Sequence, residues 1–544
     1  MAQTEFLRRA FVWGSGSCAD RIVGVLREEA VPVTVVTTLA HPEGGAGDTQ
    51  AEPPGAAAAV THIPDGRVLQ IDGHVGQFRI QVRDGEGSAC NLEAGFILVD
   101  GSSPAGWDAG LPIAVPSENL LTLTGFEALA SSCERAEMPG SIAIWLDPRE
   151  GVPDRVLATR SFRAALQLAG KGVHPIYVLH RHVPLDGLDG QELYDDLRKA
   201  GVRFFRLDTE PPACEFIAGR IELTVPDRTT TGLPAKLTVD RILPIGQPTP
   251  LSGSPEIAWL LGESLDREGF LQKDNAHLYP FRAFRKGMYY VGPCRGEFAE
   301  EEVAEEVMAV LSEVAEPLRT GVLEAREGIA IEKGRCVSCL TCYRACPHHA
   351  LDISQGPVPV PVHAACFGCG LCEALCPGRA IRLVSQPALL APAQAFKASG
   401  AWLADTPEGL VFACSRSAGL AAEAADRLGV KLPAGFHLVK IPCACSLSEE
   451  ILLDALLQGV QKVLVLGCHE DNCVSQKGTA AGRRRLRRVA EYLEASGRNV
   501  PACLQFASLA SNESHRFASL LHRFEEQSPN PANEDGGRPS RGEA

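Results

Sequence analysis

Apolar and amphipathic segments alternate along most of the 544 residues of the chain. Residues 9–38 run from an apolar segment through a glycine-rich turn and an amphipathic segment to a second apolar segment, which predicts strand, turn, helix and strand. Two further strands are predicted at 77–83 and 95–99. The same pattern returns in a second α/β unit, with strand, helix and strand predicted at 141–146, 160–169 and 174–179.

The later part of the chain follows the same pattern. Residues 287–292 predict a short buried strand, and an acidic amphipathic helix follows it. After a Pro- and Ala-rich joint at 387–395, a last α/β domain runs to about residue 525. The segment 46–60 is predicted to be a flexible loop, and the tail 526–544, which lacks core-forming residues, is predicted to be disordered.

Composition limits the kinds of partner that we expect. A hydrophobic content of 45% with 22% charged residues is typical of a globular protein. The net charge of −15 argues against a nucleic-acid partner, because an acidic protein repels phosphate. No apolar run reaches the roughly 18 residues that cross a bilayer, and the N-terminus lacks the pattern of a secretory signal. We therefore expect a cytoplasmic protein without direct membrane insertion.

Thirteen of the 19 cysteines lie between Cys336 and Cys473. Such crowding in a long chain without a secretory signal indicates metal binding rather than a disulfide framework. The strongest pattern is C-x2-C-x2-C-x3-C-P, which begins at Cys336 and again at Cys366. Structural zinc does not require this motif, so two full copies argue against zinc.

In such a pair of motifs, three cysteines wrap around one [4Fe–4S] cluster, and the fourth cysteine of each motif binds the other cluster. The predicted ligands of the first cluster are Cys336, Cys339, Cys342 and Cys376. Those of the second cluster are Cys366, Cys369, Cys372 and Cys346. The segment resembles bacterial-type ferredoxins, which implies a small α+β module.

A further group of cysteines follows the predicted strands of the last domain. Cys414 and Cys443 come at the ends of two strands, and Cys468 and Cys473 follow a third. Because the carboxyl ends of parallel strands meet at one edge of a sheet, we expect these four side chains to converge. The set predicts a [2Fe–2S] cluster, with Cys445 as an alternative to Cys443. Buried structural cysteines are the competing interpretation.

Other features surround these cysteines. Ser446 and Glu449 have the spacing of a capping box at the start of a helix. His469 follows a predicted ligand and is expected to form hydrogen bonds rather than to bind metal. A solvated face or a docking surface for an acidic partner is predicted for a cluster of five arginines, Arg483, Arg484, Arg485, Arg487 and Arg488.

Residues 407–512 resemble the delta (iron–sulfur) subunit of the deazaflavin-non-reducing hydrogenase, a family that couples hydrogenases or formate dehydrogenases to heterodisulfide reductase. The likeness rests on VFAC, IPC, LLDALLQGV, LVLGCHEDNC and the Arg-rich helix. In that family these cysteines hold a [2Fe–2S] cluster and the domain docks the partner's electron carrier. The chain departs from the family after Cys414, where CSRSAG replaces a segment that often carries extra cysteines.

The N-terminal half contains a dinucleotide-binding pattern. Gly14, Gly16 and Ala19 lie between a predicted strand and a predicted helix, where glycines let a diphosphate approach the helix N-terminus. The acidic residue that binds the ribose in such folds is missing, because the second strand ends in Thr37 and Thr38.

Most of 60–318 resembles a shortened form of the A-type subunit of heterodisulfide reductase, which is an FAD protein. The likeness rests on DGHVGQFR, AGFILVDGS, ENLLTLTGFEAL, LYDDLRKAGVRFFR, IAWLLGESLDREGF and GMYYVGPCRGEFAEEEVAEEV. It implies a Rossmann-like flavoprotein fold and an FAD site at Gly14, Gly16 and Ala19. Where the family has Ala-Thr-Gly against the cofactor, this chain has Asp100-Gly101.

The expected fold class is α/β: a Rossmann-like flavoprotein half with two dinucleotide-binding-type domains, an inserted α+β 2[4Fe–4S] ferredoxin domain and a C-terminal α/β domain. The predicted boundaries are 1–135 for the first part of the FAD-type domain, 136–240 for the second α/β unit, 241–318 for the return to the FAD-type domain, 325–386 for the ferredoxin domain, 400–525 for the delta-subunit-like domain and 526–544 for the tail.

Together these features predict an iron–sulfur electron-transfer subunit of a heterodisulfide-reductase-like oxidoreductase complex, rather than an enzyme acting alone. Electrons from a hydrogenase or formate dehydrogenase partner would pass through the [2Fe–2S] and [4Fe–4S] clusters to another redox subunit. One alternative is a self-contained FAD-dependent NAD(P)H:ferredoxin-type oxidoreductase, although the second α/β unit lacks a glycine-rich turn. The other is a scaffold with structural clusters, although eight ligands at ferredoxin spacing argue against it.

Overall fold

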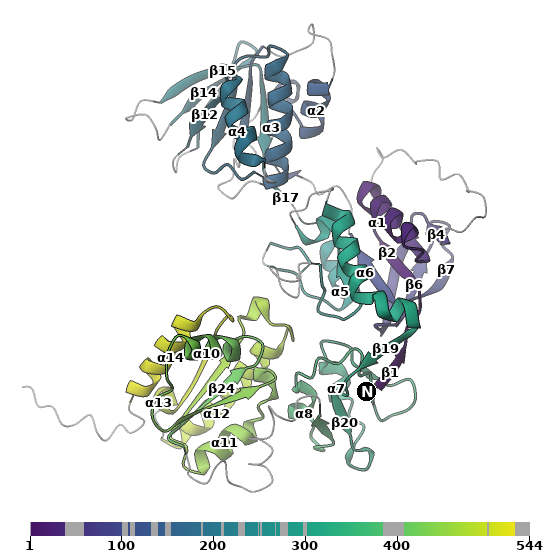
Figure 1. Ribbon diagram of the computed structural model, residues 1–544, viewed down its shortest axis with the longest axis vertical. Coiled ribbons are helices and arrows are strands. Elements are labelled where there is room, and N and C mark those ends of the chain that lie inside the picture. Colours follow the sequence, from purple (N-terminus) through teal and green to yellow (C-terminus); the bar gives the residue numbers. More distant parts are fainter. Residues whose placement is uncertain are drawn as a thin grey trace, which may run out of the picture.

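The computed structural model describes residues 2–37, 59–100, 107–108, 115–131, 140–146, 154–185, 189–207, 211–226, 234–248, 250, 253–266, 268–271, 281–296, 302–384, 407–497 and 500–527. Most of the predicted loop at 46–60, the joint at 387–395 and nearly all of the predicted tail lie outside these residues. The predicted α/β fold class with an inserted ferredoxin module is confirmed (Figure 1).

A five-stranded parallel sheet forms the centre of the N-terminal region, in the order β18-β8-β2-β3-β4. Its strands are β2 (Ala10–Trp13), β3 (Val33–Val36), β4 (Val60–Ile63), β8 (Phe96–Val99) and β18 (Met288–Tyr290). All of these except β4 are buried along their whole length, as expected of parallel strands that are covered on both faces. The strand–turn–helix–strand prediction for 9–38 is therefore confirmed.

Helices and an antiparallel sheet surround these parallel strands. The helices are α1 (Gly16–Glu28), α5 (Ser254–Leu261) and α6 (Val303–Thr320), with the 3-10 turn η3 (Gly292–Arg295). The antiparallel sheet contains β5 (Arg67–His74), β6 (Gln77–Arg83) and β7 (Ala89–Ala94). Strand β1 (Ala2–Glu5) pairs with β19 (Val322–Ala325), which leads into the ferredoxin module. The two ends of this region thus meet beside that module (Figure 1).

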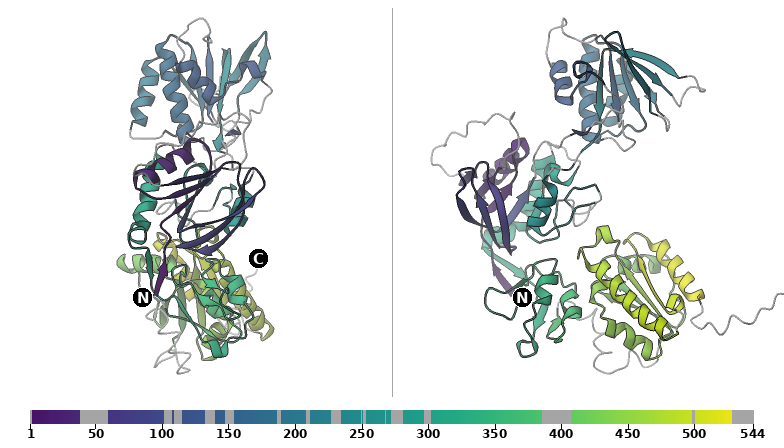
Figure 2. Two further views of the ribbon diagram at one scale, coloured as in Figure 1. Left: turned by 90° about the vertical axis from the view of Figure 1, so that its right-hand side faces the viewer. Right: turned by 180° about the vertical axis from the view of Figure 1, so that it is seen from behind.

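The second α/β unit lies apart from the ferredoxin module and the C-terminal domain in both views of Figure 2. Its parallel sheet contains β12 (Arg203–Arg206), β11 (Ile176–His180), β10 (Ile142–Leu146) and β16 (Arg241–Ile245). An antiparallel sheet contains β13 (Ala213–Ile217), β14 (Arg220–Val225) and β15 (Ala235–Val239). The remaining elements are β9 (Trp107–Asp108), β17 (Gln247–Pro248), η1 (Ser117–Asn119), α2 (Leu123–Ser131), α3 (Arg155–Gly170) and α4 (Gly190–Lys199).

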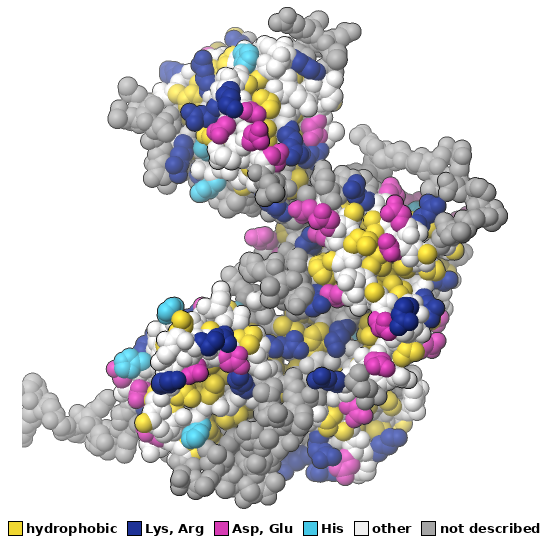
Figure 3. Space-filling model, viewed as in Figure 1, with side chains coloured by type: hydrophobic (Ala, Val, Ile, Leu, Met, Phe, Trp, Pro, Cys, Tyr) yellow, Lys and Arg dark blue, Asp and Glu magenta, His cyan; other side chains and the backbone are white. Residues whose placement is uncertain are grey.

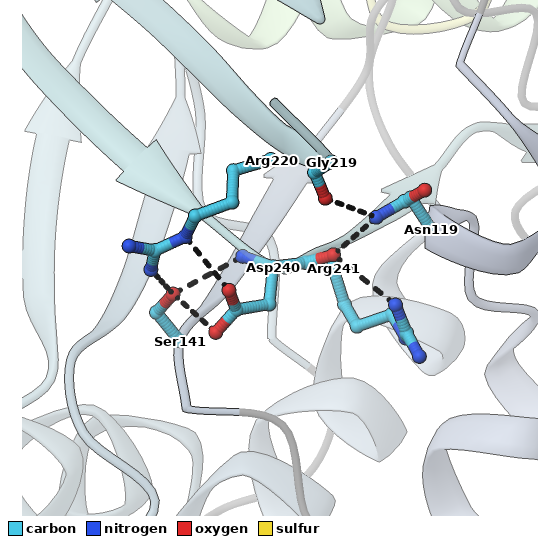
Figure 4. A network of polar contacts seen from close by, with 6 residues as sticks. All are labelled: Asn119, Ser141, Gly219, Arg220, Asp240 and Arg241. Atoms are coloured by element: carbon cyan, nitrogen blue, oxygen red, sulfur yellow. Dashed lines mark hydrogen bonds and ion pairs between the residues drawn. The ribbon is translucent and has the colours of Figure 1, made fainter. Parts of the chain in front are cut away.

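A polar network holds the two sheets of this unit together (Figure 4). The carboxylate of Asp240 accepts hydrogen bonds from Ser141 Oγ at 2.9 Å and from Arg220 Nε at 2.8 Å. Asn119 Nδ2 donates to the carbonyl oxygens of Gly219, at 3.3 Å, and Asp240, at 2.9 Å. The network links the antiparallel hairpin to the parallel sheet at the point where they join, so it fixes one sheet against the other.

The C-terminal domain has a four-stranded parallel sheet between two layers of helices (Figure 1). Its strands are β25 (Phe436–Ile441), β24 (Gly409–Cys414), β26 (Lys462–Gly467) and β27 (Leu504–Ser508). One side packs on α10 (Ala418–Arg427) and α14 (Ser514–Glu526). The other side packs on α11 (Glu449–Leu457), α12 (Gly478–Ala495) and α13 (Val500–Cys503). Both cores are formed by the alternate side chains of the same strands, which explains why the strands are apolar throughout.

The predicted capping box at Ser446 and Glu449 is wrong. Ser448 is the N-cap of α11, and its hydroxyl accepts a hydrogen bond from the Ile451 N–H at 3.2 Å. The Ser446 hydroxyl donates instead to the Cys443 carbonyl at 2.7 Å. The short 3-10 turn η6 (Ala444–Ser446) precedes the helix, and therefore Ser446 lies two residues too early to cap it.

The C-terminal domain touches both the ferredoxin module and the N-terminal region. Gln476 Nε2 donates to Glu263 Oε2 at 2.7 Å, next to the ferredoxin module, and Arg379 of that module pairs with Glu450 at 2.8 Å. Lys286 Nζ donates to the Cys366 carbonyl at 3.0 Å and so links the N-terminal region to the module. No helix among the described residues combines the length and the hydropathy needed to span a membrane.

Candidate metal centres

Two similar loops present the cysteines of the ferredoxin module. The module contains β20 (Ile329–Ile331), η5 (Lys333–Arg335), α7 (Thr341–Ala345), β21 (Leu351–Asp352), β22 (Val360–Pro361), α8 (Leu371–Leu375) and β23 (Ile381–Leu383). In the first loop Ser338 and Leu340 have left-handed φ angles of 53° and 56°. Gly368 and Gly370, at the same places in the second loop, have φ angles of 64° and 80°. These turns wrap each loop around its own cysteines.

Each loop lines a cavity of about 20 Å³. The cysteines that line the first loop's cavity are Cys336, Cys339, Cys342 and Cys376. Those that line the second loop's cavity are Cys346, Cys366, Cys369 and Cys372. The fourth cysteine of each motif has crossed to the other cavity, so the structure brings each predicted set together. That these sets bind [4Fe–4S] clusters stays a prediction, and the residues fit it, because each cavity has four sulfur donors.

Apart from the cysteines, His348 and Thr341, the side chains that line the cavities are apolar, and the backbone supplies donors to the sulfur atoms. Ile329, Leu351 and Leu371 are among the side chains that line the second cavity. The Ala350 N–H points to Cys346 Sγ at 3.4 Å, and equivalent bonds reach Cys366 Sγ at 3.4 Å and Cys376 Sγ at 3.2 Å. Burial raises the pKa of the Cys346 thiol to about 11, so metal binding there must displace a proton.

The two cavities differ in their exposure. Cys339, on the first cavity, is exposed, and the neighbouring Val337 and Tyr343 are 66% and 41% exposed. Leu371, on the second cavity, is buried against Cys443 of the C-terminal domain. The first cavity therefore opens toward solvent, whereas the second faces another part of the same chain.

The four cysteines predicted in the C-terminal domain come together at one edge of its sheet. Cys414 ends β24, Cys443 and Cys468 follow β25 and β26, and Cys473 follows the 3-10 turn η7 (Glu470–Asn472). The sulfur atoms of Cys414 and Cys468 are 3.7 Å apart. Cys443 contacts Cys414 and Cys473, and Cys468 also contacts both, so the thiols form a closed ring.

Polar groups around this ring stabilise negative charge on sulfur. Hydrogen bonds from Cys443 and then Cys468 lower the pKa of both Cys414 and Cys473. Ser417 Oγ lies 3.2 Å from Cys468 Sγ, and Thr479, in the first turn of α12, also helps to lower the pKa of Cys473. The amino end of a long helix favours a thiolate, which is the form of cysteine that binds metal.

Cys445 lies outside this ring. Its side chain is completely buried, and its sulfur is 3.5 Å from the carbonyl oxygen of Cys369 in the ferredoxin module. The sequence left Cys443 and Cys445 as alternatives for one member of the set. In the structure Cys443 is the one that contacts two other ring cysteines. His469 Nε2 is 2.9 Å from a carboxylate oxygen of Glu513, in agreement with the predicted hydrogen-bonding role.

The five arginines of α12 do not form one exposed surface. Arg485 is buried, and its guanidinium donates to backbone carbonyls of the same domain. Arg483 and Arg488 form ion pairs with glutamates of the same domain at 2.9 and 3.1 Å. Arg484, Arg487 and Arg488 are exposed. On the face shown in Figure 3, basic and acidic side chains are mixed. Because Arg488 is paired with Glu449, the cluster offers Arg484 and Arg487 to a docking partner.

The glycine-rich turn of the N-terminal region lies between a strand and a helix, as predicted, but a buried side chain lies against its first glycine. Gly14 follows β2, and α1 begins at Gly16. A Cβ placed on Gly14 would lie 1.8 Å from Oδ1 of Asp100, which is completely buried. The buried carboxyl group therefore packs against the first glycine of the turn, and a carboxylate there disfavours a second anion such as a diphosphate. A nearby buried cation, Arg295, is paired with Glu306. The surroundings of Gly14 are therefore unfavourable for FAD.

Two family models match the parts of the chain that carry these cysteines. One is described as methyl-viologen-reducing hydrogenase, delta subunit (FlpD), and matches residues 410–528. The other is described as a 4Fe-4S dicluster domain and matches residues 335–381. The D-type iron-sulfur subunit of the F420-non-reducing hydrogenase of Archaeoglobus profundus is 26% identical over 119 residues, which are 22% of this chain and 86% of that protein.

A second relative is the A-type subunit of the ferredoxin:CoB-CoM heterodisulfide reductase of Methanosarcina mazei. It is 24% identical over 277 residues, which are 51% of this chain and 34% of that protein. The chain joins a reductase-A-like region, a dicluster ferredoxin domain and an FlpD domain. The predicted resemblances are therefore confirmed. The chain spans about a third of the length of the first curated relatives that it matches.

Solved flavoproteins are also similar in part. A thioredoxin reductase of T. acidophilum superposes with a TM-score of 0.33 and 12% identity, over 57% of this chain and 100% of that chain.

The contact between the FlpD domain and the ferredoxin domain could not be predicted from spacing alone. The sequence assigned Cys445 only as a substitute ligand, and it gave no signal that Cys369 lies beside it. The burial of Arg485 was missed because the arginines were considered together, although helical spacing places it on the same face as the buried Gly482 and Val489.

Replacement of single cysteines by alanine tests the crossed grouping. Because Cys346 lines the second cavity, Cys346→Ala should lose about four irons per chain and the same electron paramagnetic resonance signals as Cys369→Ala. Cys339→Ala and Cys376→Ala should lose the other set of signals. Cys90→Ala, in β7 of the reductase-A-like region, is the control and should lose no iron. The grouping is incorrect if Cys346→Ala resembles Cys339→Ala instead.

The flavin content of the purified chain tests the interpretation of the glycine-rich turn. Since Asp100 fills the space over Gly14, denaturation should release far less than one flavin per chain, and NADH should reduce no chromophore of the isolated protein. Fluorescence of the released flavin measures the first result, and absorbance under anaerobic conditions measures the second. One flavin per chain, bleached by NADH, would support the self-contained flavoenzyme instead.

Proposed function

We propose that the chain is an iron–sulfur electron-transfer subunit of a heterodisulfide-reductase-like oxidoreductase complex. One observation carries the proposal: two neighbouring cavities with four cysteines each, the second of which is covered by the turn that bears Cys443. The names of the relatives, a heterodisulfide reductase subunit and a hydrogenase iron-sulfur subunit, support a role within a multi-subunit complex.

The cysteines have separate roles in this proposal. The two sets that line the cavities hold [4Fe–4S] clusters, and the ring formed by Cys414, Cys443, Cys468 and Cys473 holds a [2Fe–2S] cluster. When bound, such clusters accept and release single electrons. No group of three or more His, Cys, Asp or Glu side chains in the described ranges is arranged as a single-ion site. The ligands of an iron–sulfur cluster surround several atoms, whereas the ligands of a single metal ion surround one. Measured iron and sulfide contents therefore distinguish a cluster from a single ion.

The exposure of the sites suggests the direction of transfer. The donor, of hydrogenase or formate dehydrogenase type, docks at the FlpD domain, and electrons arrive at the cysteine ring. They leave from the first cavity, where Cys339 and its neighbours are exposed to a further redox subunit. The second cavity lies between the cysteine ring and the first cavity. Its loop contacts both the turn η6, which follows Cys443, and the first loop.

The reductase-A-like region acts in this proposal without a flavin at Gly14. Its contribution is to hold the ferredoxin domain, through the pairing of β1 with β19 and the bond from Lys286 to the Cys366 carbonyl. The amino group of Lys286 also lies 4.8 Å from the ring centre of Phe367, which belongs to the second loop. A cation over an aromatic ring adds to this attachment.

Iron analysis of the C-terminal site tests the proposal. The anaerobically purified chain should contain about ten irons, two of them in the FlpD domain. Cys468→Ser should reduce the content to about eight, because Cys468 contacts two other ring cysteines. Dithionite should still reduce the remaining clusters, whereas a hydrogenase or formate dehydrogenase recovered with the chain should not. A wild-type content of eight irons would remove the C-terminal cluster from the proposal, and zinc in place of iron would overturn it entirely.

Charge reversal tests the docking of the donor. Since Arg484 and Arg487 are exposed whereas the exposed Arg488 is paired with Glu449, the double change of Arg484 and Arg487 to Glu should slow reduction by the co-purified donor about tenfold at low salt. The wild-type rate should fall as salt rises, because salt screens exposed charges beyond about 8–10 Å. The matched control is Arg427→Glu on α10, across the sheet, which should leave the rate unchanged. If Arg427→Glu slows reduction as much as the double change of Arg484 and Arg487, the slowing reflects the net charge of the protein and not donor docking at α12.

A further inference from the structure

The FlpD domain and the ferredoxin domain meet at a closely packed turn. Gly370 of the second loop has a φ angle of 80°, and a Cβ placed on it would lie 2.7 Å from Ser446 Cβ. Leu371 is buried in one small core with Cys443, Cys445 and Ala481. The loop that carries Cys369 and the turn η6 therefore touch directly.

Cys445 occupies the centre of this contact. Its side chain is completely buried. On one side its S–H donates to the Cys369 carbonyl oxygen at 3.5 Å, and its side chain interacts with the Cys369 thiol. On the other side it contacts Cys443 of the ring. A single side chain thus bridges a cysteine of the second cavity and a cysteine of the C-terminal site.

The backbone at Cys445 is held in place by Arg485. This buried guanidinium donates to the carbonyls of Cys445 and Leu447, the second at 3.2 Å. Around the turn, the Arg379–Glu450 pair and the ring contact of Arg416 with Phe367, at 5.4 Å, link the two domains. The position of the Cys445 thiol is therefore fixed from both domains.

We propose that Cys445 is a positioning residue whose S–H donates a hydrogen bond to Cys369 and so raises the reduction potential of the cluster in the second cavity. The inference rests on the proposed function, because it requires Cys369 to be a cluster ligand. The acceptor is the backbone carbonyl of Cys369, so the S–H dipole lies beside a ligand sulfur. A hydrogen-bond donor beside a ligand offsets negative charge there and favours the reduced cluster.

The effect gives transfer across this interface a direction. One electron leaves the C-terminal site and one electron enters the second cavity, while no bond breaks and no proton is released, because Cys445 remains a donor before and after the transfer. The first cavity lacks this contact between domains, because Cys339 is exposed and receives its side-chain hydrogen bond from Thr341 of its own loop. A higher potential at the second cavity favours arrival of the electron there.

Potentiometric titration of the full chain, followed by electron paramagnetic resonance, tests this assignment. In Cys445→Ala, the ratio of reduced to oxidised cluster in the second cavity should fall about threefold to tenfold at a fixed ambient potential, which is the size expected from one lost hydrogen bond. The other [4Fe–4S] cluster should titrate unchanged. In Cys445→Ser the hydroxyl can still donate, so most of the wild-type ratio should return. The signals are assigned with Cys369→Ala and Cys339→Ala.

The remaining outcomes separate this inference from the proposed function. Unchanged ratios in Cys445→Ala, or a serine variant no better than alanine, would overturn the role of Cys445 while leaving the electron-transfer role of the chain intact. Loss of two irons in both variants would make Cys445 a ligand of the C-terminal site and would also overturn it. If Cys445→Ala fails to fold, Cys445→Ser decides the question. The assignment is contradicted if Cys445→Ser keeps the wild-type iron content and its reduced-to-oxidised ratio changes only for the cluster in the first cavity.

Discussion

The exchange of one cysteine between the two motifs is the constraint on which the central part of this molecule depends. Each cavity takes three sulfur atoms from its own loop and one from the other, through Cys346 and Cys376. Neither cavity is complete without the other loop, so α7 and α8 must pack together. This arrangement also orients the outer face of the second loop, where Cys369, Gly370 and Leu371 meet the C-terminal domain. The geometry of the ligands therefore determines the geometry of the interface.

The same logic applies at the edge of the C-terminal sheet. Parallel strands end side by side, so residues that follow Cys414, Ile441 and Gly467 are neighbours in space although they are far apart in sequence. The sheet thus collects its cysteines where the polypeptide turns back into helices. Because η6 lies between the ring and the second loop, one short turn serves two sites. Covalent linkage of the domains keeps these sites together at any concentration, which separate subunits achieve only by binding.

Sequence reasoning succeeded where the chemistry depends on local spacing. The C-x2-C-x2-C-x3-C-P motifs predicted which cysteines share a cavity, since the spacing and the crossing follow from a short loop around a cluster. Alternating apolar segments predicted the strands that deliver Cys414, Cys443 and Cys468. The capping box failed because a 3-10 turn shifts the start of α11, a change of register that no propensity reveals. The contact of Cys445 with Cys369 depends on the docking of two domains, and spacing within one motif carries no information on docking.

The N-terminal region shows how a fold can persist when the site it usually carries is altered. The five parallel strands are held by buried apolar side chains such as Phe11, Phe96 and Tyr290, none of which needs a bound nucleotide. Asp100 disturbs only the turn at the carboxyl end of this sheet, where ligands bind in such folds. Its N–H donates to Trp13 and its carbonyl accepts from Cys294, so the backbone there keeps its pairing while the carboxylate fills the space over Gly14. Support of the ferredoxin domain uses the opposite part of the region, at β1 and Lys286, and is therefore independent of the change at the turn.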